Sequence, residues 1–277
     1  MSSDRKKILD RLLSQDTVVR DLFIKHSALE VDKIRPHLLQ VQEQAQKVHN
    51  YRCIDHFRFL YPRSVTHPLY SVLKQRFPPS YILDIGACMG TDLRQMMVDG
   101  ATKGMIFGLE SEQSFVDLGF ELFGDRDRLG ESFVTGNIFD PRIISELLEL
   151  TTTGKKKQFR QEEGFDIIHS GSVLHLLDYS KTRLLLRRIH TLLKCDGVFF
   201  GRTTGMSQPR LSESRYLHSP ESLKSLMLEL GFSKVKIRVM ERTARSKNDP
   251  SVDHLVLAVQ GSKTNTQPTL PTMNKKS

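Results

Sequence analysis

A glycine turn between an apolar run and a helical pattern carries the clearest chemistry in this sequence. Residues 81–90 hold Asp84, Gly86 and Gly90 in the spacing D-x-G-x-x-x-G. Gly86 lacks a Cβ atom, so a ligand can approach the backbone there, and Gly90 meets a helix start whose free N–H groups suit an anionic group. An acid can hold a cationic amine, and the G-x-G-x-x-G spacing of a dinucleotide site is missing. The turn therefore favours S-adenosylmethionine over a nicotinamide or flavin cofactor.

A second carboxylate closes the next apolar run. Residues 105–109 form that run and Glu110 ends it, about 20 residues after Gly90. In a βαβ unit this spacing puts Glu110 at the carboxyl end of the neighbouring strand, where it can accept hydrogen bonds from ribose hydroxyls. The alternative is a surface glutamate that caps the following helix. Strand, spacing and residue type together favour ribose binding.

The third apolar run ends in a polar residue and an apolar one. Asn137 could bond an adenine edge while Ile138 packs on the ring. The alternative is an Asx-turn that leaves the strand, because Asn after Gly is a common turn pair. The sequence leaves both interpretations open.

The fourth apolar run, residues 165–169, ends in small residues and a histidine. Ser170, Gly171 and Ser172 would let a bound sulfonium come close to the backbone, and His175 follows them. A lone histidine is more often structural than catalytic. At the carboxyl edge of a central sheet, His175 becomes a candidate general base.

The elements that must position these residues alternate along the chain. Strands are expected at 81–85, 105–109, 132–136, 165–169, 197–202, 233–241 and 252–260. Helices are expected at 91–99, 111–123, 142–150, 180–194 and 220–230. This alternation predicts an α/β fold with a doubly wound, mostly parallel, seven-stranded sheet. The last two strands have no helix between them, so they should pair as a hairpin and put one antiparallel strand in the sheet.

The remaining chain divides by composition. Apolar residues at helical spacing run through 4–48, and an aromatic-rich link with a short helix near its end fills 50–80. We predict an N-terminal helical segment at 1–78, a cofactor-binding domain at 79–261 and a disordered tail at 262–277. The polar, basic residues 151–158 and the tail look unstructured.

Charge and cysteine content limit the partners. The formal charge of +9 raises the question of nucleic acid, but basic residues are spread over loops and helix faces and are not interleaved with aromatic ones. We therefore expect no nucleic-acid partner, and no apolar run reaches the roughly 18 residues that span a bilayer. The 3 cysteines are odd in number and widely spaced. They favour a cytoplasmic protein without disulfides or a zinc site.

With Asp84, Gly86, Gly90, Glu110 and this strand order, the chain resembles a class I S-adenosylmethionine-dependent methyltransferase. Four further blocks narrow the resemblance to the fungal O-methyltransferases of meroterpenoid and polyketide pathways, and they lie at residues 53–60, 118–129, 138–141 and 171–178. The resemblance implies methylation of a carboxyl group of a prenylated aromatic acid. It also implies that the helices before residue 81 form a lid over the pocket.

The resemblance assigns roles by position. It implies a cofactor site made of Asp84, Gly86, Gly90, Glu110, Asn137, Ile138, Ser170 and Gly171. It implies that Ser172 and His175 border the acceptor. The family more often has Asp at position 137, and an Asn oxygen can still accept a hydrogen bond from the adenine amine.

The acceptor decides which further residues matter. A carboxyl group with a pKa near 4 is ionised at neutral pH and needs no base, whereas a phenol with a pKa near 10 would benefit from His175. Arg58 or Arg202 could orient a substrate carboxylate through a bidentate pair. The alternative for each arginine is an ordinary surface ion pair.

A small-molecule O-methyltransferase, acting on an aromatic or terpenoid acid, is the favoured function. An RNA or protein methyltransferase remains an alternative and would need a basic groove around the site. A methyltransferase-like binding protein without turnover is another. The sequence is compatible with a homodimer and does not fix the oligomeric state.

Overall fold

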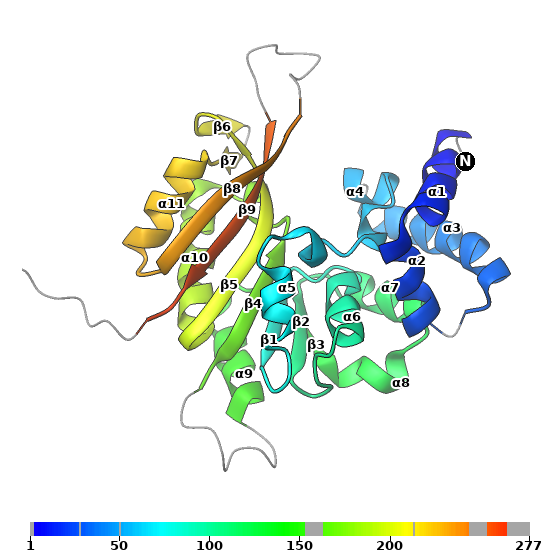
Figure 1. Cartoon of the computed structure of the whole chain (residues 1–277), viewed down its shortest axis with the longest axis horizontal. Helices are drawn as coiled ribbons and strands as arrows, with labels where there is room; N and C mark the ends of the chain where they lie inside the picture. Colours follow the sequence, from blue (N-terminus) through cyan, green and yellow to red (C-terminus); the bar gives the residue numbers. More distant parts are fainter. Residues whose placement is uncertain are drawn as a thin grey trace, which may run out of the picture.

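A seven-stranded sheet forms the centre of the protein (Figure 1). The computed structural model describes residues 3–27, 29–49, 51–152, 163–212, 214–243 and 254–264. The strand order is β3-β2-β1-β4-β5-β9-β8. The strands are β1 (Ile82–Ile85), β2 (Ile106–Glu110), β3 (Phe133–Thr135), β4 (Phe165–Gly171), β5 (Leu193–Met206), β8 (Ser233–Thr243) and β9 (His254–Ser262). Strands β1 to β5 pair in parallel, and β9 runs antiparallel to both β5 and β8. The predicted sheet with one antiparallel strand is confirmed.

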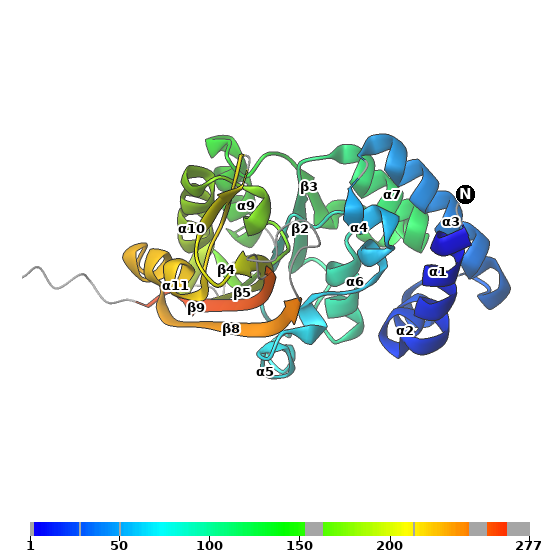
Figure 2. The ribbon, with the colours of Figure 1, turned by 90° about the horizontal axis from the view of Figure 1, so that it is seen from above.

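The central strands are covered on both faces. Every residue of β1 and β2 is buried, as expected for parallel strands that lie between two helical layers. On one face the sheet packs against α9 (Pro141–Thr152), α10 (Tyr179–Leu192) and α11 (Pro220–Glu229). On the other face it packs against α5 (Tyr70–Lys74), α6 (Thr91–Val98) and α7 (Gln113–Phe123). Figure 2, seen from above, shows these two layers.

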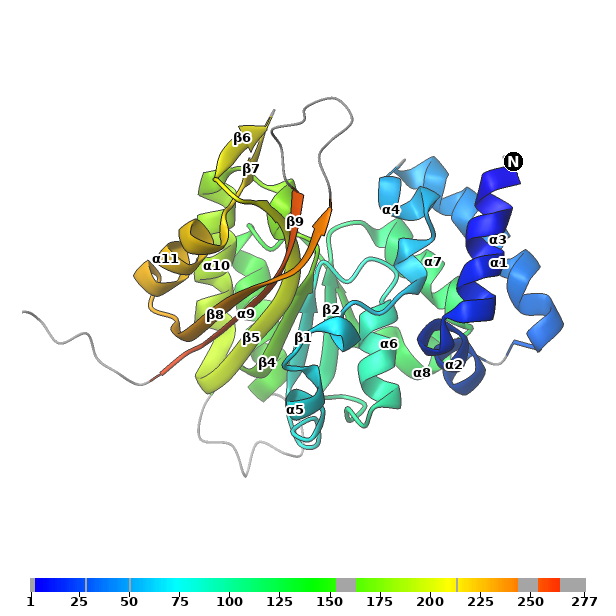
Figure 3. The ribbon, with the colours of Figure 1, turned by 45° about the horizontal axis from the view of Figure 1, so that its top comes forward.

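Three N-terminal helices add a further layer outside α7. They are α1 (Ser3–Gln15), α2 (Thr17–His26) and α3 (Val31–Val48). Helix α1 ends and α2 begins at Asp16. The Asp16 side chain accepts hydrogen bonds from the backbone N–H groups of Val18 and Val19 and so caps α2. Their apolar residues form one cluster with the outer side of α7. Figure 3 shows this layer beside α6 and α7.

The irregular parts differ most from the prediction. The link to the sheet contains α4 (Arg52–Asp55) and the short 3₁₀ turns η1 (Arg58–Leu60) and η2 (Ser64–Thr66). A small second sheet of β6 (Arg210–Ser212) and β7 (Arg215–Leu217) was not predicted, nor were α8 (Arg126–Leu129) and η3 (Gly130–Ser132). The short helical stretch expected at His175 is the 3₁₀ turn η5 (Leu174–Leu176). These elements have at most four residues, too few to show a period.

Two predicted unstructured segments need comment. Residues 151 and 152 end helix α9, so the prediction is wrong for them, and 153–162 lie outside the described residues. Strand β9 continues to Ser262, one residue into the predicted tail, and 265–277 also lie outside the described residues. Among the described residues, no helix is both long and apolar enough to cross a bilayer.

Candidate active site

A cavity of about 300 Å³ lies at the carboxyl edge of the sheet, where β1, β2 and β4 end. Parallel register brings these ends together, because Asp84 of β1 lies opposite Gly108 of β2 and His169 of β4. The facing wall comes from the link, and we call its residues 51–63 the cover segment. The cavity is lined by His49, Tyr51, Cys53, Arg58, Phe59, Tyr61, Arg63, Asp84, Gly86, Ala87, Cys88, Met89, Thr91, Asp92, Glu110, Ser111, Glu112, Phe115, Gly171, Ser172, Val173 and Leu176.

Asp84 reaches the cavity from the middle of the sheet and is paired there. Its Oδ1 lies 2.8 Å from Nδ1 of His169, and both side chains are buried. Burial raises the pKa of the Asp84 carboxyl above its usual range, against the opposing effect of His169. Burial alone would lower the pKa of His169, but the Asp84 carboxylate outweighs it and raises that pKa. The pair places a carboxyl group in the sheet at the position where a cationic amine was predicted to bind.

Glu110 is the most fully hydrogen-bonded carboxylate of the cavity wall. Its Oε2 accepts from the backbone N–H of Cys88 (2.7 Å), and its Oε1 accepts from the N–H groups of Ser111 (2.8 Å) and Glu112 (3.1 Å). A carboxylate oxygen has about two acceptor positions, so Oε2 retains one. The carboxylate is therefore fixed in place and can still accept a ligand hydroxyl, as a ribose site requires.

The two glycines of the turn have different functions. Gly86 lines the cavity at φ 74°, and a Cβ atom there would lie 2.4 Å from Val173 Cγ2. Gly90 caps α6 at φ 70° and does not line the cavity, and a Cβ atom there would lie 2.4 Å from the Phe133 ring. Gly86 lets the turn pass under the β4 loop, whereas Gly90 lets the turn pack on the sheet.

A buried arginine holds the turn from behind. Arg94 of α6 donates through Nε and Nη2 to the two carboxylate oxygens of Asp125 (2.6 and 2.7 Å), and through Nη1 to the carbonyl of Met89 (2.7 Å). His26 of α2 donates to the same carboxylate (2.7 Å). Burial alone would raise the pKa of Asp125, but the hydrogen bonds from Arg94 and His26 lower it to about 2. This network joins the glycine turn, the block at 118–129 and the N-terminal helices.

The loop after β4 contributes backbone more than side chains. Gly171 and Ser172 line the cavity, and Ser172 has φ 71°. Ser170 lies behind them, where its hydroxyl donates to the Ile85 carbonyl (3.0 Å) and ties β4 to β1. The structure thus brings Gly171 and Ser172 to the cavity and leaves Ser170 in the sheet.

His175 lies outside the cavity, although its neighbours Val173 and Leu176 line it. Its Nδ1 is 3.4 Å from the hydroxyl of Thr203 on β5. Burial lowers the pKa of His175 to about 4, and the nearby Arg63 and Arg215 charges add to this effect. The imidazole is therefore neutral at physiological pH. Its catalytic function stays a prediction.

Asn137 and Ile138 lie beyond the cavity wall. Asn137 is exposed, and its Oδ1 accepts from the N–H of Phe139 (3.0 Å), which is the Asx-turn alternative of the sequence. Ile138 packs in the core with α9. The adenine contact of these two residues stays a prediction.

The cover segment is fastened to the first turn of α6. The Thr91 hydroxyl donates to the Phe59 carbonyl (2.6 Å), and Asp92 Oδ1 accepts from the N–H of Ser64 (2.7 Å). Between these points lies Arg63, a cavity residue that the sequence did not single out. No local pattern marks it, because irregular chain has no period and its partners on α6 are distant in sequence.

The predicted arginines are placed differently. Arg58 lines the cavity and is exposed. Arg202 does not line it, and its guanidinium lies 3.5 Å from Glu241 Oε1 and 3.5 Å from the Thr66 hydroxyl.

The two cysteines of the wall, Cys53 and Cys88, are protonated thiols, because burial raises the pKa of both.

Tyr51 is another lining residue that the sequence did not single out. It stacks on His49 with ring centroids 5.0 Å apart and lies 6.3 Å from the Phe115 ring. Tyr51 lies near Glu110, and Arg63 lies near Asp92. The cover segment thus contributes both aromatic and charged side chains to the cavity wall.

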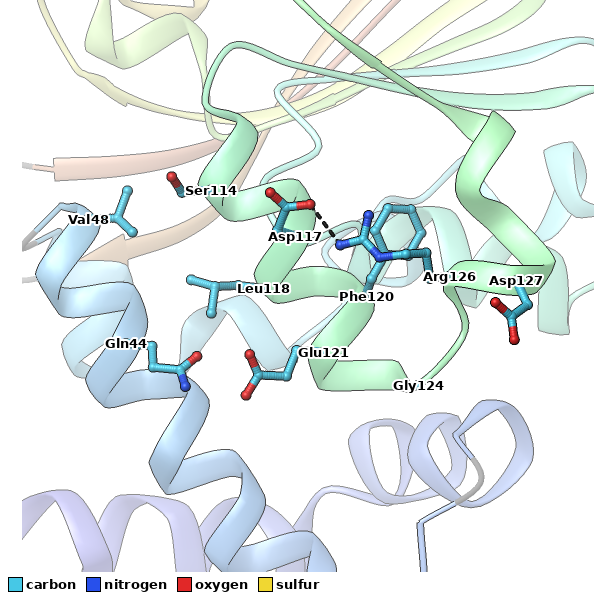
Figure 4. A pocket seen from close by; sticks show the side chains of 10 residues that line it. All are labelled: Gln44, Val48, Ser114, Asp117, Leu118, Phe120, Glu121, Gly124, Arg126 and Asp127. Atoms are coloured by element: carbon cyan, nitrogen blue, oxygen red, sulfur yellow. Dashed lines mark hydrogen bonds and ion pairs between the residues drawn. The ribbon is translucent and has the colours of Figure 1, made fainter.

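A larger hollow elsewhere is not the site. A groove of about 650 Å³ runs between α3 and α7, and Figure 4 shows Asp117 and Arg126 paired along it. It is open and has no residue from a strand end. Among the described residues, no group of three or more His, Cys, Asp or Glu side chains could hold a metal ion.

The strand order, the turn after β1 and the carboxylate after β2 together define a class I S-adenosylmethionine-dependent methyltransferase. A family model described as the meroterpenoid methyltransferase N-terminal domain matches residues 6–60. The O-methyltransferase atr3 of Stereocaulon alpinum is 30% identical over 244 residues, which cover 84% of this chain and 67% of that protein. The chain therefore belongs to the fungal O-methyltransferases.

Two further comparisons agree with this family. The O-methyltransferase phiE of Fungal sp. (strain ATCC 74256) is 29% identical over 226 residues, which cover 77% of this chain and 71% of that protein. The solved structure of an O-methyltransferase family protein from Burkholderia thailandensis matches with a TM-score of 0.50 at 17% identity, over 89% of this chain and 72% of that one. At this identity the structural likeness shows the fold alone. S-adenosylmethionine is the cofactor of the family, and the wall from Asp84 to Glu110 fits it, because the ribose position still has an acceptor.

Proposed function

We propose that this protein methylates the carboxyl group of a small prenylated aromatic acid of fungal secondary metabolism. The observation that carries the proposal is the position of His175. This candidate base lies outside the cavity, while Arg58 lines the cavity. A carboxylate arrives already ionised and needs no base, so the wall suits a carboxyl acceptor better than a phenol.

The residues of the sheet edge would hold the cofactor. The Asp84 carboxylate and the backbone at Gly86 and Gly171 would bind its amino-acid end, and Glu110 would accept from its ribose hydroxyls. The cofactor supplies a methyl group on a sulfonium, whose carbon–sulfur bond breaks as the acceptor oxygen forms its bond to carbon and the electron pair returns to sulfur. The protein contributes position and exclusion of water.

The proposal includes a division of the N-terminal segment. Residues 1–48 would support α7, because their apolar side chains pack there. The cover segment would close the cavity, because its side chains line it. The volume of the cavity, about 300 Å³, also supports a small-molecule acceptor over RNA or protein.

The experiment uses purified protein, S-adenosylmethionine and a panel of 3-prenyl-2,4-dihydroxybenzoic acids with their methyl esters. Mass spectrometry and alkaline hydrolysis would locate the new methyl group. We expect methyl esters to form from the free acids. Turnover of a pre-formed methyl ester, with the free acid inert, would contradict the carboxyl assignment.

The homodimer and the cytoplasmic location both stay predictions. Light scattering would test the homodimer, and fluorescent tagging in a fungal cell would test the location.

A further inference from the structure

Arg63 is a half-buried cation in the cavity wall without a paired anion. Its side chain lines the cavity, and among the described residues no group accepts a hydrogen bond or forms an ion pair with its guanidinium. Burying a charge without a partner is costly. Such a group is therefore expected to meet an anion when the cavity is filled.

Other arginines of the protein contrast with Arg63. The buried Arg94 is satisfied by both oxygens of Asp125, and Arg202 has Glu241 beside it. Arg58 also lines the cavity without a described partner, but it is exposed and water can solvate it. Arg63 alone of these four combines partial burial with an unpaired guanidinium.

The charges around Arg63 leave this end of the cavity positive. Arg58 and Arg202 lie near enough to disfavour its charge, and Asp92 favours it. Burial and Arg202 together lower the pKa of Arg63, although an arginine remains charged at neutral pH. Asp92 already accepts the Ser64 N–H through Oδ1, and the neighbouring His175 is neutral. The three arginines therefore have two carboxylates near them, Asp92 and the exposed Glu241 beside Arg202, and an added anion would balance the remaining positive charge.

The backbone fixes where this cation points. Thr91 holds the carbonyl of Phe59, and Asp92 holds the N–H of Ser64, so the chain is anchored on both sides of Arg63. Such anchoring reduces the ordering cost of a bidentate contact.

We infer that Arg63 is the specificity-determining residue of the cavity and receives the carboxylate of the acceptor as a bidentate pair. The inference rests on the proposed function, since a carboxyl acceptor is part of it. A carboxylate could also come from the methionine end of the cofactor. The acceptor is favoured because Arg63 acts electrostatically on His175 and lies near Arg202, and neither residue belongs to the wall proposed to hold the cofactor.

Calorimetric titration of the S-adenosylhomocysteine-loaded protein tests the acceptor. The probes are 3-prenyl-2,4-dihydroxybenzoate and its primary amide, which has no charge. In Arg63→Met we expect the acid to bind about 10- to 100-fold more weakly, the range of hydrogen bonds to charged groups, and the amide to bind within about 3-fold of wild type. Arg63→Lys should recover part of the loss. The matched control is Arg126→Met, which removes an exposed arginine of α8 and should leave both probes unchanged.

The cofactor arm compares S-adenosylhomocysteine with 5′-methylthioadenosine, which lacks the amino-acid end. We expect Arg63→Met to leave both affinities unchanged, which also shows that the variant is folded. A selective loss of S-adenosylhomocysteine would place the methionine carboxylate on Arg63 and overturn the inference. Equal binding of acid and amide by the wild type would overturn it too.

The two proposals fail in different ways. If the acid depends on Arg63 for binding but a ring hydroxyl receives the methyl group, the carboxyl function is wrong and the inference stands. If Arg63→Met forms the methyl ester with a wild-type KM, the function stands and the inference is overturned.

Discussion

The two walls of the cavity differ in how far their polar side chains are already bonded. On the sheet-edge wall, Asp84 is paired with His169, and Glu110 accepts from three backbone N–H groups. On the cover segment, Arg58 and Arg63 have no hydrogen-bond or ion-pair partner among the described residues. The polar side chains of the first wall are therefore largely paired within the protein, whereas these two arginines of the second wall are not.

This difference suggests a division of labour, in which one wall binds the cofactor and the other selects the acceptor. A rigid sheet edge can present the same groups to the same cofactor in every member of a family. An irregular segment tolerates substitution, so it is where an acceptor can be selected. We therefore expect changes on the two walls to affect different ligands.

The largest effect should come from the support behind the sheet-edge wall. Arg94→Met leaves the Asp125 carboxylate buried with a single histidine partner, and breaking such a buried pair costs about 3–5 kcal/mol. Urea unfolding should show this loss of stability. The control Arg126→Met removes an exposed pair with Asp117 and should cost at most about 1 kcal/mol. Equal losses in the two variants would contradict a structural function of Arg94.

Glu110→Ala should show most clearly that the sheet-edge wall affects the cofactor and not the acceptor. It removes an acceptor for the ribose and leaves the Cys88 N–H without its partner. We expect cofactor affinity to fall about 10- to 100-fold, measured by titration with S-adenosylmethionine. Glu121→Ala, which removes an exposed carboxylate of α7 outside the cavity, is the matched control. Affinity for the acceptor in the loaded protein should change little. Unchanged cofactor affinity would remove Glu110 from the site.

Thr91→Val tests the attachment of the cover segment. It removes the hydrogen bond to the Phe59 carbonyl, which is worth about 1 kcal/mol. We expect the acceptor KM to rise several-fold and proteolysis within residues 51–63 to become faster, with little change in cofactor affinity. Thr191→Val, on the exposed face of α10, is the control. A selective loss of cofactor affinity would contradict the division between the walls.

His175→Asn should give the smallest effect on the rate. Because burial lowers the pKa of His175 to about 4, the ring does not titrate between pH 6 and 8, and kcat should be flat there. With a carboxyl acceptor the variant should lose less than about 3-fold, whereas a lost general base costs 10²–10⁴-fold. A loss of that size, with a profile falling towards acid, would make His175 the base.

The lowered pKa of His175 also makes the stability of the protein depend on pH. The folded pKa lies below the ordinary value of about 6.5, so the unfolded chain binds the proton more readily. The stability contribution is complete above pH 6.5 and is lost as pH falls towards 4. The Tm of the wild type should therefore fall over this range more steeply than that of His175→Asn.

Sequence reasoning predicted the positions of those cavity residues that follow directly from a strand end. Asp84, Gly86 and Glu110 stand at the ends of apolar runs, and parallel strands bring such ends together whatever the loops do. The block at 118–129 was noted only as a resemblance. The structure supplies its physical reason, because Asp125 is the partner of Arg94.

The positions of Arg63 and His175 depend on contacts between distant parts of the chain, which no local sequence pattern shows. Arg63 reaches the cavity because Phe59 and Ser64 are held by Thr91 and Asp92, about thirty residues further along the chain. The exclusion of His175 depends on a single 3₁₀ turn, which directs Val173 and Leu176 to the cavity in its place. The residues that line the cavity begin at His49, and the lid function of the helices before it stays a prediction.

The Arg94 network also bears on how the enzyme releases its product after each turnover. Helix α2 is joined through His26 and Asp125 to the arginine that holds the Met89 carbonyl. Movement of the N-terminal helices would thus be transmitted to the glycine turn after β1. The cover segment packs on the same helices through Ile54, Phe57 and Leu60, and the Gln42 amide of α3 donates to the Ile54 carbonyl (2.9 Å). We therefore expect product release to depend on the N-terminal helices as well as on the cover segment.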